Sequence, residues 1–242
     1  MDFWEIMEKQ IHLKTKDGFT VYGHLNSSKK TNKLLIFVHG LSGNQTEHHY
    51  NNAPKYFNDK GYDTFRFDLY SPRKNARQIS EVSIKNHVDD LRQVVEYFQD
   101  SYSEINIISH SMGCYVVMKA GLEGINKFIY WDPTKGMNSL EEKNAKYDES
   151  LDKYILNWGL VIIISKEMVE DWKSALKISD YFKEIQRNSY FIFAGAYNIK
   201  DEWLKQIEGK FPYKIVEGAT HTFYEEGVLE KLYEYTLDFI VE

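Results

Sequence analysis

Short apolar runs that alternate with amphipathic helical patterns constrain this chain more than any other feature. The runs Leu34–Val38 and Ile105–Ser109 are apolar on both faces, which is typical of strands covered on both sides. Between Ser83 and Gln99, apolar residues recur every three or four positions and predict one face of a helix. Further strands are expected at 62–68, 128–131, 190–194 and 213–216, and a last helix from 228. This alternation predicts an α/β fold with a mostly parallel sheet and helices on both faces.

Two regions depart from the alternation. Residues 10–15 and 19–26 alternate polar and apolar side chains around Asp17-Gly18, which predicts an antiparallel hairpin at the start of the chain. Residues 133–188, hereafter the insert, are too long for a structureless loop in a compact domain. We expect the insert to be mainly helical, over 139–152 and 166–186, with a small strand pair within 154–164. The expected organisation is a core of residues 1–132 and 189–242 with the insert above the carboxyl ends of its strands, where open parallel sheets bind ligands.

Composition excludes several function classes. The chain has 36 acidic and 30 basic residues, a net charge of −6, whereas nucleic-acid binding requires a surplus of Lys and Arg. No apolar stretch approaches the ~20 residues that a membrane span needs. A single cysteine, Cys114, cannot form an internal disulfide and is typical of a cytoplasmic protein. We therefore expect no nucleic-acid partner and no membrane span, and the sequence carries no signal for an oligomeric state.

The segment Ser109-His110-Ser111-Met112-Gly113 joins a predicted strand to a predicted helix. A nucleophile elbow needs this arrangement, because its central residue lies on a sharp turn and the flanking positions must be small. Gly113 meets that need, and Ser109 stands where glycine is usual. Ser111 is therefore a candidate nucleophile, although a serine that merely caps a helix remains an alternative at this point.

Two further segments follow predicted strands and favour the nucleophile. The turn His39-Gly40-Leu41 can present backbone N–H groups to a developing oxyanion. His221 lies in Gly218-Ala219-Thr220-His221, between the last strand and the last helix, where an imidazole can accept the proton of Ser111.

These segments resemble the α/β-hydrolase superfamily. The resemblance covers most of the chain through LLIFVHGLSGN at 34–44, INIISHSMGC at 105–114, FIFAGAYNIKDEW at 191–203 and GATHTF at 218–223. It implies a nucleophile at Ser111, a general base at His221 and an oxyanion hole from the N–H groups of Leu41 and Met112. It also implies that the insert is a lid and that no cofactor is required.

The acidic member of the triad departs from the family pattern. The acid usually lies three residues after the glycine that ends its strand, here Gly195, but Asn198 occupies that position. An amide cannot stabilise an imidazolium as a carboxylate does. Asp201, three residues further on, is the favoured acid. Asp132 at the end of the preceding strand is the alternative. Asn198 itself, Glu202 or a serine–histidine dyad without an acid also stays open.

The interpretation is a lidded serine hydrolase that cleaves a small-molecule carboxylic ester or thioester. An acyltransferase of the same fold is the alternative within this chemistry. A non-catalytic binding protein is the alternative from another class, and Asn198 is its best support. Arg73 lies in a basic cluster after the strand at 62–68, which is typical of a solvated surface. The alternative is that Arg73 belongs to a rim that recognises an anionic substrate.

Overall fold

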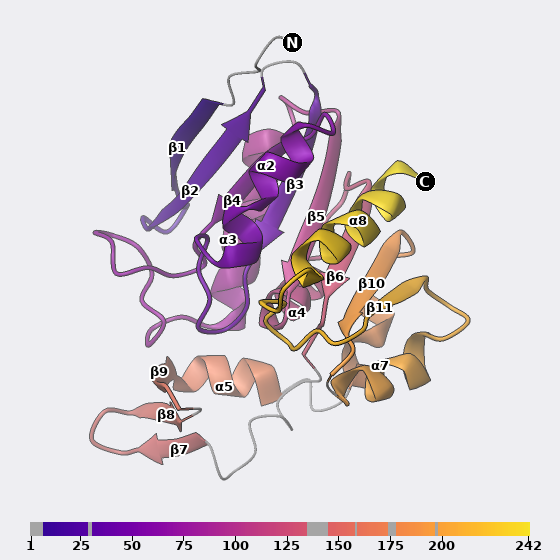
Figure 1. Ribbon diagram of the computed structural model, residues 1–242. Helices are drawn as coiled ribbons and strands as arrows, with labels where there is room; N and C mark the ends of the chain where they lie inside the picture. Colours follow the sequence, from indigo (N-terminus) through magenta and orange to yellow (C-terminus); the bar gives the residue numbers. More distant parts are fainter. Residues whose placement is uncertain (1–6, 29–30, 135–144, 158, 174–177, 197) are drawn as a thin grey trace.

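The central sheet of this chain has eight strands in the order β1-β2-β4-β3-β5-β6-β10-β11 (Figure 1). The protein is represented by a computed structural model that describes residues 7–28, 31–134, 145–157, 159–173, 178–196 and 198–242. The hairpin β1 (Met7–Lys14) and β2 (Thr20–Ser27) is antiparallel, and β2 pairs antiparallel with β4 (Asp63–Phe67). The remaining pairs are parallel, between β4 and β3 (Lys33–Val38), β5 (Glu104–His110), β6 (Lys127–Trp131), β10 (Ser189–Ala194) and β11 (Tyr213–Val216). The predicted fold class is confirmed.

Helices cover both faces of the sheet, and each face has its own apolar cluster. One face carries α1 (His48–Asn51), α2 (Ala53–Asn58) and α8 (Val228–Val241). The other carries α3 (Ile84–Phe98), α4 (Met112–Ala120) and α7 (Ile199–Ile207). The predicted start of α3 is confirmed by a capping box, in which the Ser83 hydroxyl accepts the N–H of Asn86 at 3.2 Å. None of the helices in the described ranges is long and apolar enough to cross a membrane.

The insert contains more strand than the sequence predicts. Its strands β7 (Ala145–Asp148), β8 (Lys153–Asn157) and β9 (Val161–Ser165) form a separate antiparallel sheet. The predicted helix over 139–152 is wrong at 145–152. Residues 145–148 pair with β8 and 149–152 form the turn between the two strands, so strand pairing overrides local propensity; 139–144 lie outside the described residues. The predicted strand pair is confirmed as β8 and β9. The predicted helix over 166–186 occurs as α5 (Lys166–Lys173), α6 (Ile178–Tyr181) and the 3₁₀ turn η2 (Phe182–Glu184), and 174–177 lie outside the description.

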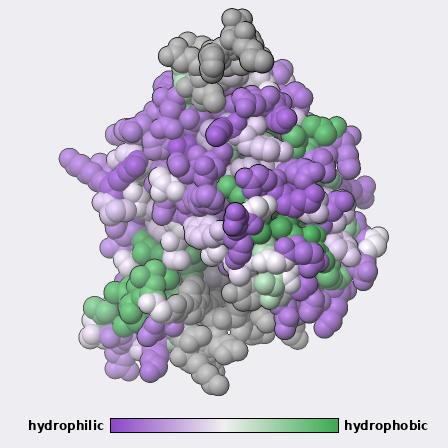
Figure 2. Space-filling model, viewed as in Figure 1, coloured by the Kyte–Doolittle hydropathy of each residue, from purple (hydrophilic) through white to green (hydrophobic). Residues whose placement is uncertain are grey.

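The insert shares the hydrophobic core on the α3 side of the sheet. Leu156 and Ile164 are fully buried on one face of its sheet, together with Met168 on α5. The hydroxyl of Ser165 also donates to the carbonyl of Val82, just before α3. In Figure 1 the insert lies below the lower end of the central sheet. Its outer side is apolar, because Leu160, Val161 and Ile163 are exposed, and Figure 2 shows the resulting patch at the lower left.

Candidate active site

Ser111 lies in a strained turn between β5 and α4. Its backbone adopts φ 54° and ψ −121°, a conformation that residues other than glycine rarely take. The turn is tight because α4 packs directly against the end of β3. A Cβ at Gly113 would lie 2.6 Å from the carbonyl oxygens of Val38 and His39, so only glycine fits there. This is the nucleophile-elbow geometry that the sequence predicts for Ser111.

Ser111, His221 and Asp132 form one hydrogen-bonded chain. The hydroxyl oxygen of Ser111 lies 2.8 Å from Nε2 of His221, and Nδ1 of His221 lies 2.5 Å from Oδ2 of Asp132. A carboxylate only accepts, so Nδ1 carries the proton and Nε2 is free to accept the serine proton. In the sequence, His221 lies 110 positions after Ser111 and 89 positions after Asp132. The three side chains meet because they follow β5, β6 and β11, whose carboxyl ends share one edge of the sheet.

Asp132 is fixed from several sides. Its side chain is fully buried at the end of β6, and its Oδ1 accepts the N–H of Ala194 at 3.1 Å. Its own N–H donates to the carbonyl of Ile192 at 2.8 Å, and its φ is +41°. A buried carboxylate needs such partners, because burial of an unpaired charge costs several kcal/mol. The carboxylate oxygen that faces His221 is therefore held in place by β10.

The expected contact between Asp201 and His221 does not form. Asp201 is exposed in the first turn of α7, and its nearest ionic partner is Lys200 at 3.9 Å. This segment is a helix because Trp203 and Ile207 bury one face, and acidic residues are favourable in a first helical turn. Asn198 is exposed at the N-cap of α7 and makes no side-chain capping bond there.

The turn that follows β3 lies next to Ser111 in space. A Cβ at Gly40 would lie 2.9 Å from Cβ of Ser111, so glycine lets this turn approach the serine. The Gly40 carbonyl lies 2.8 Å from Nδ1 of His39 and 3.2 Å from the Tyr70 hydroxyl, which both donate to it. Nε2 of His39 in turn accepts the N–H of Leu69 at 2.9 Å. Burial lowers the pKa of His39, which agrees with this neutral, doubly bonded ring.

Leu41 follows Gly40 in this turn, and Met112 follows Ser111 as the first residue of α4. The first N–H groups of a helix lack intrahelical acceptors. Within the described residues, neither the Leu41 nor the Met112 N–H donates a hydrogen bond to another residue. The two predicted oxyanion donors thus lie close to the elbow: Leu41 follows Gly40, which approaches Ser111, and Met112 follows Ser111 itself.

Sequence reasoning missed Glu47, a carboxyl group beside this turn. It is the N-cap residue of α1 and is half-buried, and its Oε2 accepts the N–H of Asn44 at 3.3 Å. A Cβ at Gly43 would lie only 2.4 Å from the same oxygen. Burial raises the pKa of Glu47 to about 7, although the nearby His221 opposes this shift. No ion pair joins Glu47 to a lysine or arginine in the described part of the chain.

Two other residues from the sequence analysis lie apart from this chemistry. Arg73 is exposed, and its guanidinium stacks over the ring of Tyr22 in β2, 5.2 Å from the ring centroid. The structure brings it to neither Ser111 nor His221. Cys114 is buried on α4, and burial raises the pKa of its thiol, so it is an inert core residue.

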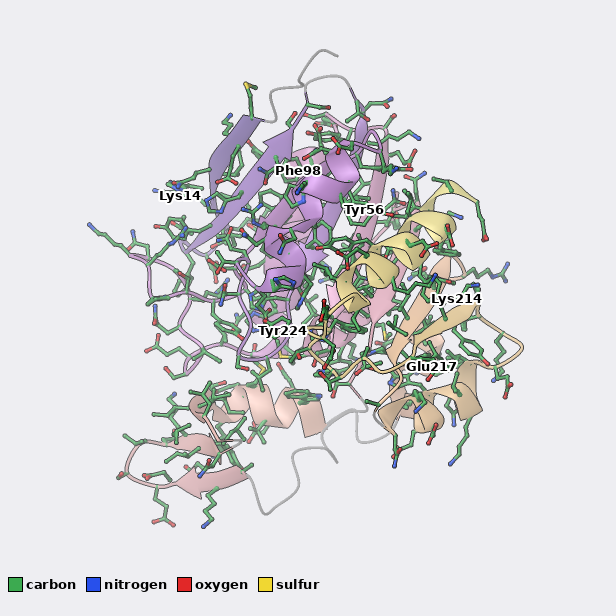
Figure 3. All side chains as sticks on the ribbon, in the orientation of Figure 1. Lys14, Tyr56, Phe98, Lys214, Glu217 and Tyr224 are labelled. Carbon is green, nitrogen blue, oxygen red and sulfur yellow. The ribbon has the colours of Figure 1, made fainter. Side chains whose placement is uncertain are left out.

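Figure 3 shows the end of the molecule at which the loop after His221 lies. Tyr224, three residues after His221, lies at the lower end of α8, on the side of the core that faces the insert. Its side chain is half-exposed and makes an edge-on contact with His48, with ring centroids 5.7 Å apart. The insert therefore lies at the same end of the sheet as the loop that carries His221 (Figure 1).

Comparison with known proteins agrees with this arrangement. Residues 29–130 match the family model described as serine aminopeptidase, S33. A search of curated proteins finds no match. Among solved structures, the α/β hydrolase GrgF from Penicillium sp. sh18 aligns with a TM-score of 0.76 and 14% identity, over 97% of this chain and 98% of that one.

Two esterase structures also align along almost the whole chain. Est1E from Butyrivibrio proteoclasticus, solved with ferulic acid bound, has a TM-score of 0.76 and 19% identity, over 96% of this chain and 100% of that one. An esterase from Pyrococcus furiosus has a TM-score of 0.72 and 15% identity, over 98% and 91%. At these identities the likeness shows the fold, which all three proteins share with this chain along almost its whole length.

Proposed function

We propose that this chain, which belongs to the α/β-hydrolase superfamily, is a serine hydrolase that cleaves carboxylic esters or thioesters through an acyl-enzyme on Ser111. The observation that carries the proposal is the unbroken hydrogen-bonded chain from Ser111 through His221 to Asp132. In hydrolases, such a chain turns a weakly nucleophilic hydroxyl into an attacking group.

The reaction has two halves. Oγ of Ser111 attacks the substrate carbonyl carbon while its proton passes to Nε2 of His221. The tetrahedral intermediate collapses when the carbon–oxygen or carbon–sulfur bond breaks, and His221 returns the proton to the leaving alcohol or thiol. Water then attacks the acyl-enzyme, gives a proton to His221, and releases the carboxylic acid as Ser111 regains its proton.

Asp132 is the acid in this mechanism, in place of Asp201. Its carboxylate orients the imidazole of His221 in the tautomer that can accept the serine proton, and it stabilises the imidazolium that forms. The N–H groups of Leu41 and Met112 bind the oxyanion. The insert is the lid. Its apolar side chains share one buried cluster with those of α3, which supports a fixed position beside the lower end of the central sheet in Figure 1.

The strongest argument for a non-catalytic protein no longer holds. That alternative rested on Asn198, which lacks a carboxylate where the family usually has one. Because Asp132 already contacts His221, position 198 is free to vary. Hydrolysis is therefore the function that the geometry supports best.

The test is covalent labelling of the purified protein with a fluorophosphonate probe. We expect one probe per chain, found on Ser111 by peptide mass spectrometry and absent from Ser111→Ala. Ser101→Ala, which removes an exposed serine between α3 and β5, is the matched control and should label like the wild type. A folded wild-type protein that takes up no probe would overturn the proposal.

Turnover distinguishes the substrate classes. We expect hydrolysis of p-nitrophenyl acetate or of an acyl thioester to fall by at least about 10³-fold in Ser111→Ala. An aminoacyl p-nitroanilide tests the amide chemistry named by the matched family model. Cleavage of the anilide alone would replace the ester proposal with a peptidase.

A further inference from the structure

We propose that His110 is a positioning residue that ties the loop carrying His221 to the nucleophile elbow. The inference rests on the proposed function. Nε2 of His110 lies 2.7 Å from the backbone carbonyl oxygen of His221. Since a carbonyl only accepts, His110 donates this bond. The residue next to the nucleophile in the chain therefore holds the backbone of the residue that must deprotonate it.

The bond closes a short ring around the reacting atoms. From His110, one peptide bond leads to Ser111, whose hydroxyl contacts the His221 side chain at 2.8 Å, and the His221 carbonyl returns to His110. The position of the serine relative to the imidazole is thus set from both sides. A displacement of about 1 Å between reacting groups can cost on the order of 100-fold in rate.

The surroundings of His110 make this bond strong and keep the ring neutral. The side chain is almost fully buried, and its ring lies 5.2 Å from that of His49, 4.7 Å from that of His221 and 6.0 Å from that of Phe223. Burial and the charge of His221 lower the pKa of His110 well below the usual value. A neutral donor can brace His221 without placing a second positive charge beside its imidazolium.

Burial of a histidine does not by itself imply such a bond in this protein. His87 on α3 is also fully buried, yet neither of its ring nitrogens has a hydrogen-bond partner among the described residues. Its pKa falls to about 3, with burial as the main cause. His87 is therefore a matched control, because its substitution removes a buried imidazole that makes no hydrogen bond to Ser111, His221 or Asp132.

The experiment compares three variants in ester turnover. His110→Phe keeps an aromatic ring but loses the donor, and we expect kcat to fall about 10- to 100-fold with KM changed less than about threefold. His110→Gln keeps an N–H donor of similar reach and should recover kcat to within about fivefold of the wild type. His87→Phe should leave both constants unchanged. If His110→Phe does not fold, His110→Asn replaces it, because its shorter amide cannot span the distance.

Equal kcat in His110→Phe and wild type, with both proteins folded, would overturn the positioning role. A loss in His110→Phe that His110→Gln does not recover would assign His110 to packing alone.

A second readout does not depend on turnover. The Nδ1 proton of His221, bonded to Asp132 at 2.5 Å, should give a far-downfield proton resonance, assigned by its loss in His221→Gln. We expect this resonance to be lost or shifted in His110→Phe and retained in His110→Gln. If the wild type proves inactive, the proposed function fails, yet the resonance still decides whether His110 positions His221. An identical resonance in wild type and His110→Phe would refute the inference.

Discussion

Two polar networks, each built around one buried carboxylate, join distant parts of this chain, and they put similar groups to different uses. The proposed catalytic chain, hereafter the catalytic chain, consists of Ser111, His221 and Asp132, at the carboxyl ends of the parallel strands. The second, hereafter the hairpin anchor, consists of Asp17, Arg77 and Asp90. Each contains one fully buried carboxylate that is bonded to a nitrogen-bearing side chain from another part of the chain.

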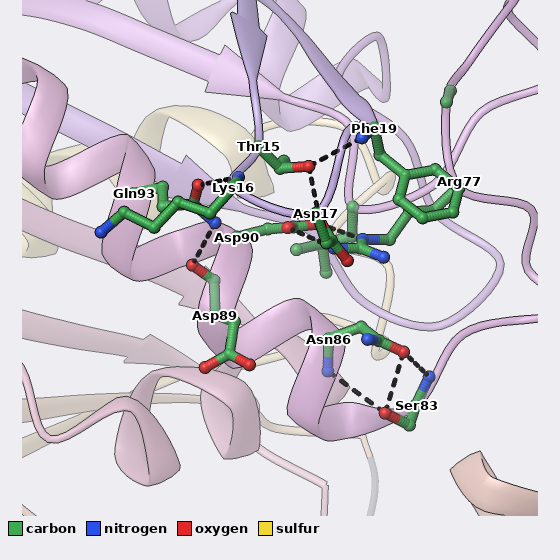
Figure 4. Close-up of polar contacts among 12 residues, drawn as sticks. Thr15, Lys16, Asp17, Phe19, Arg77, Ser83, Asn86, Asp89, Asp90 and Gln93 are labelled. Atoms are coloured by element: carbon green, nitrogen blue, oxygen red, sulfur yellow. Dashed lines mark hydrogen bonds and ion pairs between the residues drawn. The ribbon is translucent and has the colours of Figure 1, made fainter.

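The hairpin anchor joins the first turn of the chain to α3 (Figure 4). Nε of Arg77 lies 2.6 Å from Oδ2 of Asp90, and Nη2 lies 2.9 Å from the second oxygen of that carboxylate. Nη2 also contacts Asp17 in the turn between β1 and β2 at 2.9 Å, and the guanidinium stacks over Phe19, 4.4 Å from the ring centroid. The Arg77 guanidinium thus donates hydrogen bonds to two carboxylates and packs against one aromatic ring.

The two networks differ in whether they contain a group that can exchange a proton. The arginine of the hairpin anchor keeps its charge at every accessible pH, so the network can only hold parts together. The catalytic chain contains an imidazole whose second nitrogen faces a hydroxyl, and protons can move along it. Substitutions in the two networks should therefore separate rate from stability.

The largest expected effect contrasts two aspartates. Asp132→Asn should lower kcat by about 10³- to 10⁴-fold, because the amide favours the wrong tautomer of His221. Asp201→Asn should stay within about twofold of the wild type, since its exposed side chain makes no contact with His221. Steady-state ester hydrolysis measures both. A larger loss in Asp201→Asn than in Asp132→Asn would contradict the assignment of the acid.

The next effect concerns stability. Arg77→Met should destabilise the fold by about 3 kcal/mol, because it leaves Asp90 charged and buried without its partner. Asp17 contributes little to this figure, as its side chain is half-exposed. Urea unfolding measures the change, and the kcat of the folded variant should not move.

Two controls sharpen this prediction. Arg77→Met combined with Asp90→Leu should recover most of the lost stability, since no buried charge remains. Arg73→Met, an exposed substitution in the same loop, should change stability by less than about 0.5 kcal/mol. If Arg73→Met lowers kcat/KM for anionic esters but not for neutral ones, the rim role expected from the sequence stands despite its distance from the catalytic chain.

The smallest expected effect involves the half-buried carboxyl group of Glu47. Among the described residues it has no partner like the arginine that pairs with Asp90 or the histidine that bonds to Asp132. Its folded pKa of about 7 exceeds its ordinary value of 4.5, so the folded state binds this proton more tightly than the unfolded chain. The resulting stabilisation is complete below about pH 4.5 and is lost as the pH rises through 7.

Glu47→Gln removes this ionisation. Between pH 5 and 8 the free energy of unfolding of the wild type should fall by about 2 kcal/mol relative to the variant, after allowance for its partial exposure. Urea unfolding at several pH values measures the difference. Parallel curves for the two proteins would show that Glu47 has an ordinary pKa.

Most of the core fold could be predicted from local patterns. The strands at 34–38, 105–109 and 213–216 and the helix over 83–99 were expected because burial on one or two faces imposes a period on the sequence. The insert was harder to predict. The strand at 145–148 lacks such a period, since Lys146 and Tyr147 are both exposed, and its conformation comes from pairing with β8.

The sequence by itself identified Ser111 and His221 as the candidate nucleophile and the candidate base. Ser111 and His221 could be found because an elbow requires small residues at fixed spacing and because each residue follows a strand. Such constraints are local in the chain, so they can be seen without coordinates. His110 lay in the same pentapeptide, but nothing in its spacing reveals that it reaches the carbonyl of His221.

Only the tertiary structure decided which acid completes the chain. Asp132 and Asp201 both follow strands that lead to the same edge, so their positions in the sequence cannot distinguish them. The choice depends on whether residues after β10 continue as a loop or begin a helix. Burial of Trp203 and Ile207 against the core forms α7 and turns Asp201 into solvent, while β10 clamps Asp132 beside His221. That outcome is set by packing between distant segments, which a local pattern does not contain.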